Sequence, residues 1–175
     1  MQTPHESHWK SAKILLRYIR GKIQFGIHNS TGGTPLLVGF TDSDWADDPD
    51  DRKSTAGYVF SVGFVPVTWD CKKQQVVALS SVEAEYRAIV NASQEALWLR
   101  QILSEFAFEQ QQLTLIWCDN QNAIKLTKYP VQRQHNKHIE LHMHFSINID
   151  HYHSLEVLVF PTDDQVVDIF TESLT

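Results

Sequence analysis

Residues 36–42 (LLVGFTD) and 113–119 (LTLIWCD) are two short, mostly apolar stretches that each end in an aspartate. Apolar runs of this length are typical of buried strands. Functional groups of open α/β sheets collect at the carboxyl ends of the strands. We therefore expect Asp42 and Asp119 to lie near each other at one edge of a sheet. The alternative is that both aspartates only begin turns or cap the next element.

The sequence around these two stretches predicts alternating strands and helices. Short links between the first strands favour antiparallel pairing, and strands separated by helices favour parallel pairing. We therefore predict an α/β fold with a mixed five-stranded sheet and helices on both faces. The expected strands are 36–40, 55–61, 65–69, 113–118 and 155–160, with a further short strand at 23–27. The expected helices are 4–20, 80–106 (capped by Ser80 or Ser81), 120–128, 138–151 and 165–174.

The bulk properties describe one ordinary globular domain with a short appendage. The chain has 175 residues, a formal net charge of −6 and two cysteines, which match no metal-ligand spacing and predict no disulfide framework. The negative charge argues against a general nucleic-acid binder, but a metal-dependent nuclease also gathers carboxylates. The sequence contains no signal-like or membrane-spanning stretch, so we expect an intracellular protein, cytoplasmic or nuclear, without a membrane partner.

Two further acids complete a candidate metal site. Glu85 lies in the first turns of the expected long helix, and Asp168 lies near the start of the last one. Converging carboxylates repel each other unless cations bind, and hard cations such as Mg²⁺ or Mn²⁺ prefer oxygen ligands. Spacing alone does not select Asp42, Glu85, Asp119 and Asp168 from the 21 acidic residues of the chain.

Six strings in the chain together resemble the ribonuclease H domain of copia-type retrotransposon polyproteins. The resemblance runs from about residue 38 to residue 170. Residues 1–27 resemble the end of the reverse transcriptase region of the same polyproteins. We therefore divide the chain into an N-terminal segment, 1–33, and a ribonuclease H domain, 34–175. The six strings, in order, are GFTDSDWADDPDDRKSTAGYVF, KKQQVVALSSVEAEYRAI, ALWLRQIL, IWCDNQNAIKL, NKHIELHMHF and PTDDQVVDIF.

This resemblance implies a ribonuclease H fold and an endonuclease that hydrolyses the RNA strand of RNA–DNA hybrids. It implies two divalent ions, Mg²⁺ or Mn²⁺, one to activate water and one to stabilise the leaving 3′ oxygen. Asp42 would bridge both ions, Glu85 and Asp119 would serve one side, and Asp168 the other. Glu85 fits the pattern better than Glu83. Selection of RNA would come from its 2′-hydroxyl groups.

The chain departs from its cellular and retroviral relatives in several ways. The loop before Asp168 is short and lacks the histidine of those relatives. The basic segment of the cellular enzymes that is called the handle is also absent. Asp47 and Glu172 add negative charge where the family pattern has Gly and Lys, which should weaken binding of a polyanion. The phosphate contacts are then expected from Arg52, Lys53, Lys72 and Lys73, unless these form only a solvated face.

Other side chains suggest sites that we consider weaker. His138 and His142 are spaced like zinc ligands, but packed or exposed helix histidines are the simpler interpretation for this pair and for His135 and His144. Four tryptophans suggest base stacking, namely Trp45, Trp69, Trp98 and Trp117, and core packing is the simpler interpretation for all of them but Trp45. The competing function is a truncated or host-adopted, retrotransposon-derived protein that binds nucleic acid or protein as a regulatory module and does not need catalysis. A third interpretation, a domain whose acids are only structural, requires the resemblance to extend to the fold alone.

Overall fold

The computed structural model describes residues 3–21, 23, 35–46, 50–128, 154–161, 167 and 171. Its sheet has five strands in the order β3-β2-β1-β4-β5. The first three strands pair antiparallel, whereas β1 with β4 and β4 with β5 pair parallel. The predicted mixed five-stranded sheet is therefore confirmed. The strands are β1 (Leu37–Asp44), β2 (Thr55–Val62), β3 (Val65–Lys73), β4 (Thr114–Cys118) and β5 (Leu155–Val159).

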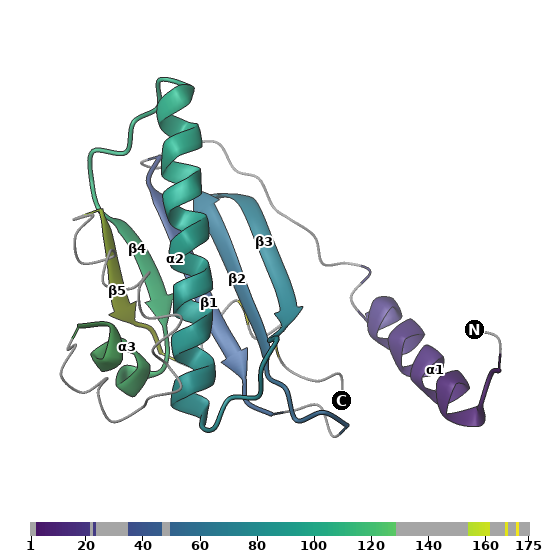
Figure 1. The fold of residues 1–175 in the computed structure, drawn as a ribbon. Helices are drawn as coiled ribbons and strands as arrows, with labels where there is room; N and C mark the ends of the chain where they lie inside the picture. Colours follow the sequence, from purple (N-terminus) through teal and green to yellow (C-terminus); the bar gives the residue numbers. More distant parts are fainter. Residues whose placement is uncertain are drawn as a thin grey trace.

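One long helix, α2 (Ser81–Glu105), crosses a face of the sheet (Figure 1). Helix α3 (Gln121–Lys128) packs against both α2 and β5. The core lies between α2 and the sheet, because every second strand residue points to that face. Its largest fully buried apolar side chains are Tyr86, Phe60, Leu37, Ile89, Ile116 and Val90.

The start of α2 is fixed by a capping arrangement. Ser80 is the N-cap, and its hydroxyl oxygen accepts a hydrogen bond from the Glu83 N–H at 3.2 Å. The Glu83 carboxylate accepts in turn from the Leu79 N–H at 2.9 Å. Of the two predicted caps, Ser80 is therefore the one used. Helix ends leave N–H groups without partners, so these bonds determine where α2 begins.

Gly39 in β1 lets the aromatic ring of Phe60 lie directly over the strand. A Cβ atom at this position would lie 2.2 Å from Cε1 of Phe60, which is inside van der Waals contact. Phe60 is fully buried and stands opposite Gly39 on β2. The small residue thus allows β1 and α2 to share one large aromatic side chain.

Two strands are longer than the sequence pattern predicted. β1 continues past Phe40 to Asp44, because its antiparallel pairing with β2 extends to Asp44 opposite Thr55. β3 continues past Trp69 to Lys73, which also stands opposite Thr55. Asp42 therefore lies within β1, where its pairing with Gly57 of β2 sets its position.

The N-terminal helix α1 (Glu6–Gly21) confirms the predicted helix and stands to one side of the sheet (Figure 1). None of its residues is buried. Its apolar side chains Trp9, Leu15, Leu16 and Ile19 are exposed.

No helix in the described part of the chain is both long and apolar enough to cross a membrane. The predicted strand at 23–27 and the predicted helices at 138–151 and 165–174 lie outside the described residues, except for residues 23, 167 and 171.

Candidate active site

Three of the four predicted carboxylates meet at one edge of the sheet. Asp42 comes from β1, Glu85 from the second turn of α2, and Asp119 follows the last residue of β4. The side chains of Asp42 and Glu85 are hydrogen-bonded to each other, and the charge of Asp119 acts on both. Ligand atoms of Glu85, Cys118 and Asp119 all lie within 4.8 Å of one another. Asp168 lies outside the described residues.

Burial and neighbouring charges raise the pKa values of the two buried acids, Asp42 and Glu85. Burial, followed by the charges of Asp42 and Asp119, raises the pKa of Glu85 to about 9. Burial also raises the pKa of Asp42, with the charge of Asp119 adding to the effect. The shared hydrogen bond is consistent with a protonated Glu85 that donates to an ionised Asp42 at neutral pH.

Two further groups fix the position of Asp42. The Thr171 hydroxyl donates a hydrogen bond to Asp42 Oδ2. The main-chain N–H of Ser43 hydrogen-bonds to the carboxyl groups of both Asp42 and Glu85. Both contacts lower the pKa of Asp42 and so oppose the larger effect of burial. Neither Thr171 nor Ser43 was predicted from the sequence. Thr171 lies 129 positions from Asp42, and the contact of Ser43 with Glu85 depends on the packing of α2 against β1.

Cys118 adds a thiol to the acidic group. It is fully buried, and its Sγ donates to Glu85 Oε2 at 3.8 Å. Burial first, and then the neighbouring charge of Glu85, raise the pKa of this thiol well above its usual range. The thiol is therefore neutral here and serves as a weak donor to the carboxyl group beside it.

The preference for Glu85 over Glu83 has a structural reason. Besides capping α2, Glu83 forms an ion pair with Arg87 in which Nη2 lies 2.8 Å from Oε1. The two side chains are only 7% and 12% exposed. Glu83 thus has its charge compensated within the helix. The interactions of Asp42 and Glu85 with described residues include no lysine or arginine.

The donor set fits divalent metal ions. Two buried acids with no cationic partner in the described part of the chain, next to a third carboxylate, form a site whose negative charge is uncompensated. Oxygen ligands of this kind suit Mg²⁺ and Mn²⁺, and cation binding would displace the proton of Glu85. The residues Asp42, Glu85 and Asp119 are those that could hold the ions.

Comparisons of the whole sequence point to transposon polyproteins. The chain is 39% identical over 175 residues to the retrovirus-related Pol polyprotein from transposon RE2 of Arabidopsis thaliana, which covers 100% of the chain and 12% of that polyprotein. It is 38% identical over 175 residues, with the same coverage, to that from transposon RE1 of the same plant. The relatives that match the whole of this chain are thus retrovirus-related Pol polyproteins of copia-type transposons. It spans about an eighth of the length of these two relatives.

Other comparisons of this Pol-related chain agree on the fold. It resembles the N-terminal ribonuclease H domain of a Mycobacterium tuberculosis protein, with a TM-score of 0.58 and 11% identity over 78% of this chain and 90% of that one. It also resembles LC11-RNase H1 determined in complex with an RNA/DNA hybrid, with a TM-score of 0.54 and 11% identity over 77% and 93% of the two chains. The predicted ribonuclease H fold is thus confirmed. No family model matches the chain.

Another relative of the Pol-related chain is a shorter protein with a different name. The secreted RxLR effector protein 161 of Plasmopara viticola is 46% identical over 96 residues, which is 55% of this chain and 68% of that protein. Sequence of this type therefore also occurs in a protein that is not named as a polyprotein.

The predicted phosphate-binding residues of the Pol-related chain lie on two neighbouring segments. Arg52 and Lys53 precede β2, and Lys72 and Lys73 end β3, opposite the start of β2. Three of the four are close to carboxylates: Lys72 lies 2.6 Å from Asp70, and Lys73 and Lys53 lie 3.5 and 3.8 Å from Asp51. Arg52 is exposed. These ion pairs reduce the positive charge that the segment offers to a polyanion.

The exposure of the tryptophan side chains differs from the sequence prediction. Trp69 and Trp98 are 49% and 54% exposed, so the prediction that they pack in the core is wrong. Trp69 lies on the edge strand β3 and Trp98 on an outward face of α2. Trp45 is 46% exposed, and its indole N–H donates to the Ala78 carbonyl at 3.1 Å. The four histidines with zinc-like spacing lie outside the described residues.

Proposed function

We propose that this chain is a metal-dependent ribonuclease H that hydrolyses the RNA strand of RNA–DNA hybrids. The observation that carries the proposal is the meeting of Asp42, Glu85 and Asp119 at the edge of a ribonuclease H fold, where Asp42 and Glu85 lack a cationic partner among the described residues. Ionising two neighbouring buried carboxyl groups at the same time is costly in free energy unless cations bind beside them.

The carboxylates would have distinct roles. When bound, two Mg²⁺ or Mn²⁺ ions would supply an activated water and stabilise the leaving 3′ oxygen. Asp42 would contribute a ligand to both ions, and the Thr171 hydroxyl and Ser43 N–H would keep its carboxylate oriented. Glu85 would give up its proton to become a ligand on one side with Asp119. Asp168 would be the fourth ligand, and its neighbour Val167 lies near Gly57 of β2, across from Asp42.

The proposed partners are an RNA–DNA hybrid and the reverse transcriptase region of the same polyprotein. The resemblance in fold to a ribonuclease H determined with an RNA/DNA hybrid supports the first. Two observations support the second partner. The match to the Pol polyprotein extends over the whole of this chain, and apolar side chains of α1 are exposed. Exposed apolar stripes of this kind often mark a protein interface.

The substrate class is tested by cleavage with a panel of nucleic acids. A labelled RNA strand would be offered to the protein in Mg²⁺ or Mn²⁺ as a hybrid with DNA, as an RNA duplex and as a single strand, beside a DNA duplex. We expect internal cuts in the RNA of the hybrid alone, and no cuts when a chelator removes the metal. Equal cutting of single-stranded RNA would contradict the proposal of hybrid specificity.

The second candidate is a binding module that does not require catalysis. It is favoured by the similarity to the RxLR effector protein, of which the chain covers 68%. The three carboxylates that meet in the structure favour the nuclease. A protein that binds the hybrid but leaves it uncut in both Mg²⁺ and Mn²⁺ would support the binding module instead.

A further inference from the structure

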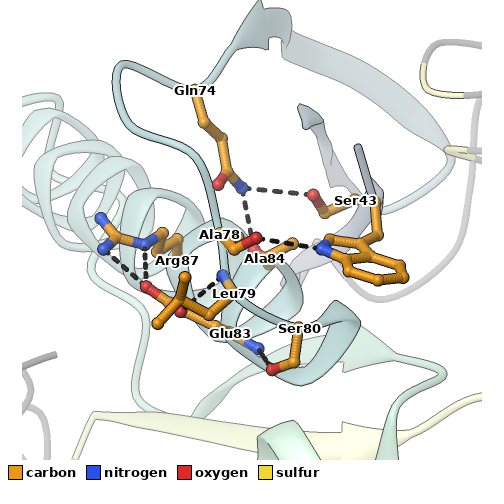
Figure 2. A network of polar contacts seen from close by, with 9 residues as sticks. Ser43, Gln74, Ala78, Leu79, Ser80, Glu83, Ala84 and Arg87 are labelled. Atoms are coloured by element: carbon orange, nitrogen blue, oxygen red, sulfur yellow. Dashed lines mark hydrogen bonds and ion pairs between the residues drawn. The ribbon is translucent and has the colours of Figure 1, made fainter. Parts of the chain in front are cut away.

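Gln74 links the segment before α2 to two different elements (Figure 2). It directly follows β3, and only 8% of it is exposed. Its side-chain Nε2 donates to the Ser43 hydroxyl at 3.2 Å and to the Ala84 carbonyl at 2.9 Å. Its main-chain N–H donates to the Ser54 carbonyl at 2.8 Å, so the backbone of Gln74 is itself held in place.

The two acceptors of Gln74 are the chain neighbours of two candidate metal ligands. Ser43 follows Asp42 in β1, and Ala84 precedes Glu85 in α2. The N–H of Ser43 also bonds to the carboxyl groups of both acids. A single amide group therefore connects the strand that carries Asp42 to the helix that carries Glu85. These acids repel each other once both are ionised, so a fixed link between their elements opposes their separation.

The stability of the fold does not explain why a polar side chain occupies position 74. Its Nε2 must face the Ala84 carbonyl, which only accepts, and this leaves Oε1 buried without a partner among the described residues. A buried acceptor without a donor is destabilising. Both of its acceptors have other interactions, because the Ser43 hydroxyl donates to the Thr55 carbonyl and the Ala84 carbonyl lies within α2, where a carbonyl accepts from the N–H four residues further on. An apolar side chain of similar length would therefore avoid an unpaired buried oxygen.

We propose that Gln74 is a positioning residue that fixes the spacing of Asp42 and Glu85 for metal binding. The inference rests on the proposed function, because it concerns the same carboxylates. Other contacts hold the loop itself. The Trp45 indole bonds to Ala78, and the Glu83 carboxylate accepts from Leu79 and pairs with Arg87 (Figure 2). Loss of the Gln74 amide therefore removes one direct link between β1 and α2 without releasing the segment that precedes α2.

The test compares Gln74→Met with Gln75→Met. Methionine keeps the length of the side chain and removes both polar atoms, and Gln75 is the exposed neighbour of the same residue type. Mn²⁺ affinity is measured by calorimetry, stability by urea unfolding in metal-free buffer, and kcat and KM on a hybrid. Loss of such an outer contact typically lowers metal affinity or activity by about 10–100-fold. We expect a loss of this size in Mn²⁺ affinity and kcat for Gln74→Met, with KM and stability maintained, and no change for Gln75→Met.

A second variant keeps the inference testable if Gln74→Met does not fold. Ser43→Ala removes one acceptor of the Gln74 amide and leaves the bond to Ala84. We expect Ser43→Ala to lower Mn²⁺ affinity by less than about 10–100-fold with stability maintained, and unchanged Mn²⁺ affinity would overturn the inference. If Gln74→Met does fold, the double variant should lose no more than Gln74→Met alone, because the residues act through one contact.

The failure of this inference is distinguishable from that of the proposed function. If the unaltered chain binds Mn²⁺ and cuts the hybrid, and Gln74→Met does so equally well, the positioning role alone is overturned. A lower unfolding free energy with unchanged Mn²⁺ affinity per folded molecule would also overturn it, because that is the signature of a structural role. If the unaltered chain neither binds Mn²⁺ nor cuts the hybrid, both fail together.

Discussion

Glu85 carries a proton at neutral pH because the fold buries it beside two other acids. Burial and the charges of Asp42 and Asp119 raise its pKa to about 9. In the unfolded chain the same group ionises near its ordinary pKa of 4.5. Between these pH values the folded protein binds a proton that the unfolded chain has lost, so stability falls as the pH rises. Asp42, whose pKa is also raised, contributes with the same sign.

Glu85→Gln should therefore flatten the pH dependence of stability. Glutamine has the shape of the protonated carboxyl group, so we expect little change in the free energy of unfolding near pH 5. Towards pH 9 we expect the variant to be the more stable protein in metal-free buffer, with a difference growing by at most about 1.4 kcal/mol per pH unit. Urea unfolding at several pH values measures this. The control is Glu105→Gln, which changes an exposed carboxylate on the same helix. Parallel curves for Glu85→Gln and the unaltered chain would show that Glu85 is not protonated in the fold.

At the scale of elements, periodicity predicted the helices and strands of the described residues, and tertiary pairing decided the lengths of β1 and β3. The predicted helix at 80–106 corresponds to α2, but Phe106, which the prediction placed inside the helix, is its C-cap and is 78% exposed. The extension of β1 to Asp44 depends on its register with β2, which no local pattern contains. The space for Phe60 over Gly39 likewise arises only when two strands pair.

Helix α1 should be dispensable for the stability of the sheet and α2. None of its residues is buried, and an isolated helix of this length is marginal in water. We predict that a chain beginning at residue 34 unfolds with the same free energy as the whole chain, to within about 0.5 kcal/mol, the usual range for surface changes. Urea unfolding of both chains measures this and tests the proposed division into 1–33 and 34–175. A stability loss of several kcal/mol would show that α1 packs on the domain in solution.

At the scale of the molecule, the site depends on contacts between distant parts of the chain. The strand-end aspartates and Glu85 could be predicted because apolar runs and the family resemblance mark them. Gln74, Thr171 and Cys118 could not, because their importance lies in which atoms they touch after folding. The Thr171 hydroxyl reaches Asp42 across 129 positions of sequence. Sequence thus indicated the candidate ligands, and the fold revealed the groups that hold them.

Asp42→Asn is the variant that most directly distinguishes a loss of catalysis from a loss of folding. Asparagine keeps the shape and one oxygen for the Thr171 hydroxyl, but it removes the charge needed to hold hard cations. Loss of one preorganised stabilising group commonly costs about 10²–10³ in rate, and a ligand to both ions should cost at least that. Stability in metal-free buffer should be unchanged or higher, because Asp42 is buried beside other acids.

The decisive measurement is therefore cleavage of the labelled RNA strand of an RNA–DNA hybrid by the unaltered chain and by Asp42→Asn, at matched amounts of folded protein in Mg²⁺ and in Mn²⁺. We expect cuts by the unaltered chain and a rate at least about 10²-fold lower for Asp42→Asn. Equal cleavage by the two proteins would contradict the proposed site. Absence of cleavage by both, in either metal, would contradict the proposed activity and leave the binding module as the better explanation.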